Sequence, residues 1–298
     1  MGIKRILNNW VKKSPWFVEG DLKDCQKFWD GIPYNLEVVN LGSNSAKYGF
    51  DYSDLNVNAA NLAMGPQCLL MDLNVLKAYI DHLSKNAIVF IPMCPFSSMA
   101  GYNYLIDPKY HSFLPKEYIP NFNKKTLARM INLKNNPINT YPLMRLFVDM
   151  KNALMKLFKH SGRPVSFDSD AQKWINAWMS EFDINSFEDE LSEENAQNLK
   201  DSASIMKSIF DYCIDNGLRP YVVLPPITNA LSQKLSPSMR EKYIFDYLKK
   251  AEIPAEHFLN YLDNEEISRN IMYFQNAYFL NSKGAKLFTK KILSAVGK

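Results

Sequence analysis

Short apolar runs that alternate with helix-spaced apolar residues are the feature that most restricts the fold of this 298-residue chain. Residues 87–91 are apolar without a break, which is typical of a strand buried on both faces of a parallel sheet. Residues 36–41, 221–224 and 258–262 have similar length and character, and a further short strand is predicted near 55–57. The sequence therefore predicts about five strands.

Helical patterns lie between these strands. Apolar residues recur every three or four positions over 69–83, 199–213, 238–250 and 282–296. Strands that alternate with helices predict an α/β fold with three layers, in which helices cover both faces of a parallel sheet. Ligands of such folds bind at the carboxyl ends of the strands, so the segments that follow those ends are where a site is expected.

Residues 95–195 interrupt the alternation. Tyrosines and phenylalanines are scattered here among prolines and lysines, and helical patterns return near 124–133, 141–159 and 170–180. The acid-rich stretch 183–194 predicts a solvated loop. We interpret the region as a helical, aromatic-rich insertion or cap within a single domain of residues 1–298.

The first eighteen residues combine basic charge with an apolar stripe. They hold four basic residues and no acid, and the other 280 residues balance, which accounts for the net charge of +4. One interpretation is an amphipathic helix over residues 1–13 in weak contact with a membrane surface; the one we favour is a short helix docked by its apolar stripe. The stripe is Ile3, Ile6, Leu7, Trp10 and Val11, and the bases are Lys4, Arg5, Lys12 and Lys13.

Several classes of protein are disfavoured by what the sequence lacks. No segment holds the roughly 20 consecutive apolar residues that span a bilayer, and the first residues lack the apolar core of a signal peptide. The four cysteines form no C-x-x-C pair, and no phosphate loop, G-x-G-x-x-G or H-E-x-x-H motif occurs. The balanced body argues against nucleic acid as a partner. We expect a cytoplasmic protein, peripheral to a membrane if residues 1–13 bind one, without cofactor or metal.

Three segments, in this order, resemble sequence blocks of the SGNH (GDSL-like) hydrolases. Residues 39–45 (VNLGSNS) resemble the first block, residues 61–67 (NLAMGPQ) the second and residues 276–285 (NAYFLNSKGA) the last. The resemblance implies a flavodoxin-like fold and ester chemistry in a cleft at the strand ends. It is nearest to bacterial SGNH-like proteins associated with surface glycan or teichoic acid acylation, so a carbohydrate or acyl-ester ligand is expected.

The three positions that match the family's catalytic triad carry residues without the required chemistry. Asn44 occupies the nucleophile position, and Asn276 and Phe279 occupy those of the catalytic Asp and His. An amide is no serine-like nucleophile, and a phenyl ring accepts no proton. We therefore expect a catalytically degenerate protein that binds a glycan, an acylated ligand or a partner in the former active-site cleft.

Two alternatives remain open. The chain is an active esterase or O-acyltransferase on a carbohydrate ester if Ser43 or Ser45 replaces the usual nucleophile, and it is an intracellular scaffold if the aromatic insertion binds other chains. The remaining residues singled out as oxyanion-hole or pocket candidates are Gly42, Asn61, Gly65 and Cys94. Each also has a purely structural interpretation, such as a tight turn at Gly42 or an inert, partly buried thiol at Cys94.

Overall fold

The computed structural model describes residues 2–18, 20, 22–101, 106–142, 147–148, 151 and 166–298. The chain divides into two compact units. The sheet unit consists of Pro33–Asn103 and Val165–Lys298, and the helical unit of Met1–Ile32 and Tyr104–Pro164. The expected insertion of residues 95–195 is thus divided between the units: its last part joins the sheet unit, and residues 104–164 group with the N-terminal segment.

The sheet unit is built on five parallel strands in the order β2-β1-β3-β4-β5, which confirms the predicted α/β, three-layer, flavodoxin-like arrangement. Because β1 pairs with both β2 and β3, the strand order reverses beside β1. The strands are β1 (Leu36–Asn40), β2 (Ala59–Asn61), β3 (Leu83–Pro92), β4 (Arg219–Leu224) and β5 (Phe258–Asn260).

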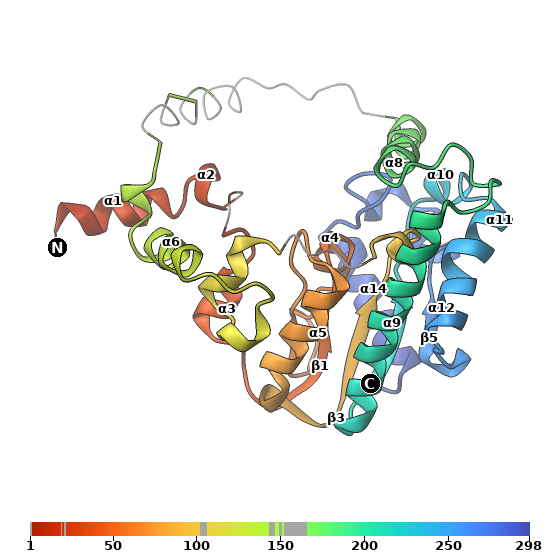
Figure 1. Cartoon of the computed structure of the whole chain (residues 1–298), viewed down its shortest axis with the longest axis horizontal. Coiled ribbons are helices and arrows are strands. Elements are labelled where there is room, and N and C mark those ends of the chain that lie inside the picture. The colour runs from red at the N-terminus through yellow and green to blue at the C-terminus, as the bar shows by residue number, and fades with distance from the viewer. Residues whose placement is uncertain are drawn as a thin grey trace. The chain divides into compact units, whose positions relative to one another are not determined.

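Helices cover both faces of the sheet. Alternate side chains of each strand point to opposite faces, and Val38, Phe90 and Val223 form one buried core with Phe288 and Ile292 of the last helix. In Figure 1, α5 and α9 lie in front of the sheet and α14 behind it. The helices of this unit are α4 (Asn44–Gly49), α5 (Leu69–Ala78), α8 (Phe167–Glu181), α9 (Glu193–Asp215), α10 (Asn229–Ser232), α11 (Pro237–Arg240), α12 (Asp246–Lys250), α13 (Glu265–Ser268) and α14 (Ser282–Ala295).

One strand lies elsewhere than predicted. The sequence placed it near residues 55–57, whereas β2 covers Ala59–Asn61, in register with β1 from Val38 to Asn40. Alanine and asparagine have low intrinsic preference for strands. Pairing with β1 therefore decides the position of β2, and the local pattern of apolar residues does not.

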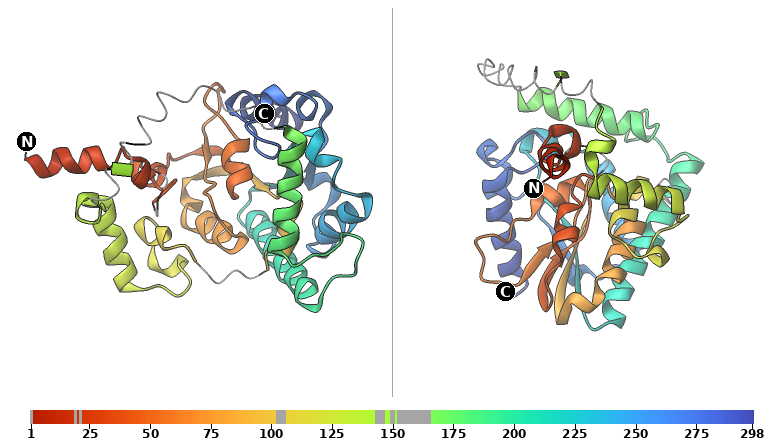
Figure 2. Two further views of the ribbon diagram at one scale, coloured as in Figure 1. Left: turned by 90° about the horizontal axis from the view of Figure 1, so that it is seen from above. Right: turned by 90° about the vertical axis from the view of Figure 1, so that its left-hand side faces the viewer.

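The helical unit contains α1 (Ile3–Val11), α2 (Pro15–Val18), α3 (Gln26–Asp30) and α6 (Lys124–Asn135). Our favoured interpretation of the first helix was wrong: four of its five stripe residues are exposed. Instead α1 is held by the buried side chains of Asn8 and Val11, and Asn8 Oδ1 accepts the Ile138 N–H at 3.1 Å. Figures 1 and 2 show α1, in red, projecting beyond α6. The predicted helix over 141–159 lies largely outside the described residues.

Candidate functional site

A cleft opens at the carboxyl ends of β1 and β3, which is the point where the strand order reverses and where ligands of such sheets bind. It encloses about 300 Å³. The turn after β1 and the start of α4 supply Gly42, Ser43, Asn44 and Ser45. The start of α5 and the two residues before it supply Gln67, Cys68, Leu69 and Asp72. The end of β3 and the segment that follows supply Pro92, Cys94, Phe96, Ser97 and Ala100. The outer wall consists of Trp174, Trp178, Glu181 and Phe182 of α8 and its end, with Tyr278 and Phe279.

The turn from β1 into α4 fixes the floor of the cleft. Gly42 has a φ of +108°, a backbone conformation that residues with a side chain rarely adopt. A Cβ at this position would also lie 2.7 Å from the Cβ of Ala46. Ser43 follows as the residue that precedes α4, and its Oγ accepts the Gln67 N–H at 3.1 Å. The turn therefore requires glycine at position 42 and ties the β1 loop to the loop before α5.

Asn44 and Gly65, from the first two blocks of the resemblance, lie against each other. A Cβ built on Gly65 would fall 1.9 Å from Oδ1 of Asn44, so only a glycine leaves room for this amide. Gly65 was an oxyanion-hole candidate. The Asn44 side chain covers the side of Gly65 on which a Cβ would lie.

A buried carboxyl group stands behind the β1 loop. Asp72, on the first turn of α5, is only 2% exposed and accepts the Gly42 backbone N–H at 2.7 Å. The Gln67 side-chain amide donates a second hydrogen bond to the same oxygen and also donates to the Gly42 carbonyl. Burial raises the pKa of Asp72 to about 7, against the opposing effect of these two donors. The carboxyl is therefore committed to positioning Gly42.

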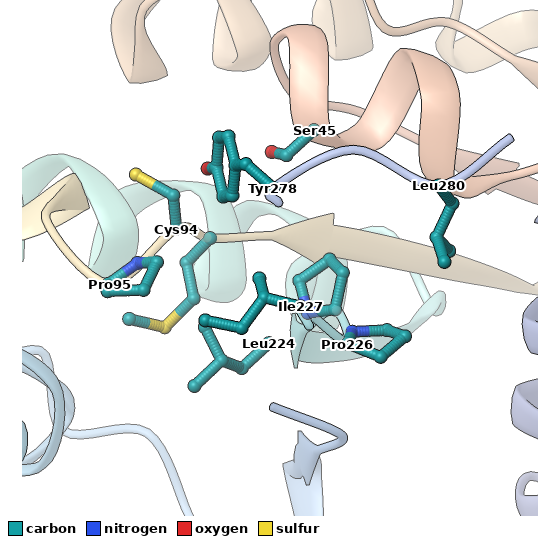
Figure 3. Close-up of a pocket in the computed structure, with 10 residues that line it drawn as sticks. Ser45, Cys94, Pro95, Leu224, Pro226, Ile227, Tyr278 and Leu280 are labelled. Carbon is teal, nitrogen blue, oxygen red and sulfur yellow. The ribbon is translucent and has the colours of Figure 1, made fainter. Parts of the chain in front are cut away.

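Ser45, Cys94 and Tyr278 meet at the inner end of the cleft (Figure 3). The Tyr278 hydroxyl lies beside the side chains of Ser45 and Cys94, and burial raises the pKa of Tyr278 well above its usual value. Cys94 is further tied to Ser97, whose Oγ accepts the Cys94 N–H at 2.8 Å and donates to its sulfur at 3.5 Å. Behind them is a small apolar cavity lined by Met93, Pro95, Leu224, Pro225, Pro226, Ile227 and Leu280.

Asn276 holds the loop that carries the two aromatic residues. Its Oδ1 accepts the backbone N–H groups of Tyr278 at 2.9 Å and Phe279 at 2.7 Å. Phe279 enters the cleft and packs on the rings of Tyr48 and Trp174, with centroid distances of 5.2 and 5.3 Å. Asn276 itself does not line the cleft, so Asn44 and Phe279 meet there while Asn276 positions the loop beside them.

Asn61 takes a structural position outside the cleft lining. Its Oδ1 accepts from Asn40 Nδ2 at 2.9 Å and from the Ala63 N–H at 3.0 Å, and its Nδ2 donates to the Phe50 carbonyl at 3.0 Å. The amide therefore links β2, β1 and the end of α4.

Sequence reasoning missed two kinds of cleft residue. Asp72 could have been noticed as the one acid between Asp54 and Asp81, near the start of an apolar helix. Trp174 and Trp178 were placed on a predicted helix of the insertion, but nothing local indicates that their helix closes the cleft of the sheet. Only the folded chain brings α8 to the ends of β1 and β3.

None of the described residues that line the cleft is a histidine. His82 stacks on Tyr34, His111 belongs to the helical unit, His257 contacts the Pro220 carbonyl, and His160 lies outside the described residues. Within the described part of the chain, no three side chains of His, Cys, Asp or Glu gather in a way that could hold a metal ion.

Comparison with known proteins supplies no family for this chain. No protein-family model matches it, and no curated protein matches it. The helices in the described ranges include none that is long and apolar enough to cross a bilayer.

Proposed function

We propose that the cleft binds a glycan or an acylated carbohydrate without hydrolysing it, in a protein that is related to the SGNH hydrolases and has lost their catalytic groups. One observation carries this proposal: Asn44 and Phe279, which match the nucleophile and base positions, line the same cleft at the ends of β1 and β3. Asn276, at the third matching position, fixes the backbone of Phe279. The residues at all three matching positions therefore lie in the cleft or hold the loop that lines it.

The lining chemistry supports binding of a carbohydrate-like ligand. Trp174 is half-buried and, with Phe279 and Tyr278, offers ring faces and edges to apolar parts of a ligand, as aromatic walls do in binding pockets. Amide and hydroxyl groups of Asn44 and Ser43 line the same cleft and suit the hydroxyl groups of a sugar. A pocket with apolar walls and a few polar groups both holds and orients a ligand.

Among the described residues, no hydrogen bond joins Ser45 to a histidine or a carboxylate that could act as its general base. Its polar neighbour is Tyr278, whose raised pKa keeps the phenol protonated. The Asp72 carboxyl accepts from Gly42 and Gln67, so it is engaged away from the serine. A serine hydroxyl without a base is a weak nucleophile. These features support binding over the alternative of an active esterase or O-acyltransferase.

The absence of hydrolysis is tested with two reagents. The protein is incubated with p-nitrophenyl acetate and with a fluorophosphonate probe, and labelled peptides are located by mass spectrometry. We expect no ester turnover above a heat-denatured control and no label. A label on Ser43 or Ser45 that disappears in the matching Ser→Ala variant would establish the active-enzyme alternative instead.

Binding is tested by titrating the full chain with O-acetylated and de-acetylated oligosaccharides while tryptophan fluorescence is recorded. We expect saturable binding that weakens at least tenfold in Trp174→Ala. Trp10→Ala, which removes a part-exposed tryptophan of the helical unit, is the matched control and should bind as the unaltered chain does. No saturable change with either ligand class, or equal loss in both variants, would refute the proposal. A membrane contact through residues 1–13 would be made by the helical unit and does not involve this cleft.

A further inference from the structure

The two units of the chain carry opposite net charges. The helical unit holds 17 Lys and Arg residues against 7 Asp and Glu residues, a net charge of +10, whereas the sheet unit holds 18 against 24, a net charge of −6. The sequence had placed the excess of base in the first eighteen residues only. Because the fold groups residues 1–32 with residues 104–164, the excess belongs to the whole helical unit and the sheet unit is acidic.

The helical unit also exposes much apolar surface. Of the thirteen large apolar side chains that are exposed among the described residues, eight belong to this unit, which comprises less than a third of the chain. Four of them form one face of α1, which we call the exposed face. It consists of Ile3 (76% exposed), Ile6 (56%), Leu7 (41%) and Trp10 (45%).

The exposed face is free because α1 packs by another edge. Val11 is fully buried, Asn8 is nearly so and accepts the Ile138 N–H, and Trp10 touches Tyr141 only in an edge contact at 5.4 Å. On a helical wheel these anchors lie to one side of the exposed face. The helix is therefore fixed to its unit while most of its apolar side chains remain in contact with solvent.

Basic side chains lie on the side of α1 away from the exposed face and just beyond its last residue. Lys4, Arg5, Lys12 and Lys13 are all exposed, and residues 2–18 include no acid. In the same unit, Lys124, Lys125 and Arg129 are exposed on α6. Apolar side chains beside a basic surface are the arrangement with which helices bind in the interface plane of anionic bilayers, and a tryptophan is a side chain that favours that interface.

We propose that the helical unit is a docking module for anionic membrane surfaces, with the exposed face of α1 inserted among the lipids and the basic residues at the headgroups. The alternative partners each suit only one of two features of this surface, which are its exposed apolar side chains and its positive charge. A second copy that docks through its own helical unit brings a further net charge of +10, and like charges oppose that contact. A nucleic acid would satisfy the charge and leave the apolar side chains in water. A bilayer with acidic lipids satisfies both.

Flotation of the full chain with vesicles tests the proposal. One set contains phosphatidylcholine alone and the other contains 30% phosphatidylglycerol. We expect the chain to float with the anionic vesicles, at least tenfold less with the neutral ones, and less as salt is raised. Equal partition between the two sets, or no flotation with either, would overturn it.

Matched variants assign the binding to the exposed face. Ile3→Asp with Ile6→Asp should reduce anionic-vesicle binding at least tenfold, because both side chains are exposed and their replacement leaves the packing of α1 intact. Met272→Asp, at an exposed apolar position of the sheet unit, and Trp174→Ala in the cleft should bind as the unaltered chain does. Unchanged binding in the double variant would refute the role of α1, and a concentration-dependent dimer abolished by it would replace the membrane with a second copy.

Discussion

The carboxyl group of Asp72 accepts the backbone N–H of Gly42 at 2.7 Å, thirty residues away in the chain. This contact joins the first turn of α5 to the end of β1 and, with Gln67, holds the loop that carries Asn44 and Ser45. Since the pKa of Asp72 is raised to about 7 by burial, the cleft floor rests on a group that titrates near neutrality.

Asp72 should make the protein less stable as the pH rises. The folded pKa of about 7 lies above the ordinary aspartate pKa of 3.8, so between about pH 4 and 7 the folded state retains a proton that the unfolded state has lost. Stability falls through that window by at most about 1.4 kcal/mol per pH unit from this group. Urea unfolding of the unaltered chain and of Asp72→Asn between pH 4 and 8 should show the variant gaining relative stability up to pH 7. A pH-independent difference would contradict this.

Replacing Gly65 should reveal its contact with Asn44. In Gly65→Ala the new methyl group meets the Asn44 amide, and we expect a loss of about 1–3 kcal/mol, as for other overpacked sites. The same change in an Asn44→Ala background should cost less, because the obstructing amide is gone. A double-mutant cycle of unfolding free energies measures the coupling. Additive effects would mean that the two residues do not interact.

The Asn276 amide oxygen should stabilise the C-terminal loop. Asn276→Ala removes the acceptor for two backbone N–H groups and should cost about 1–3 kcal/mol of unfolding free energy. Asn276→Asp keeps an oxygen in the same place and should retain most of this stability. Thermal unfolding of the three proteins decides the matter, and equal loss in both variants would show that another property of Asn276 is responsible.

Two of the four thiols should react in the folded protein, and the other two should react only on unfolding. Cys25 and Cys213 are fully buried, and burial raises the pKa of each to about 12, so they should react with a thiol reagent only on unfolding. Cys68 and Cys94 are half-buried in the cleft wall and should react in the folded protein. Peptide mapping after timed exposure to iodoacetamide at pH 8 gives the order, and Cys94→Ser is the control. Early labelling of Cys213 would contradict the packing of α9.

The sequence was a good guide wherever local pattern and tertiary environment agree. The apolar run that became β3 is buried on both faces, and its unbroken apolar character identified it without knowledge of its partners. The second strand was misplaced because Ala59–Asn61 pair with β1 through the backbone, which no side-chain pattern records. Gly42 was correctly singled out, since a strand end at a tight turn requires the conformation that glycine permits.

The sequence by itself determined the fold class and the strand ends where the cleft lies. The tertiary structure alone decided that Asp72 and Trp174 reach that cleft, because side chains far apart in sequence meet only after the helices pack on the sheet. It also decided where the charge lies. Beyond residue 18 the numbers of basic and acidic residues are equal, but the fold divides these residues between a basic unit and an acidic unit. The reason is that folding groups residues by contact and not by order in the chain.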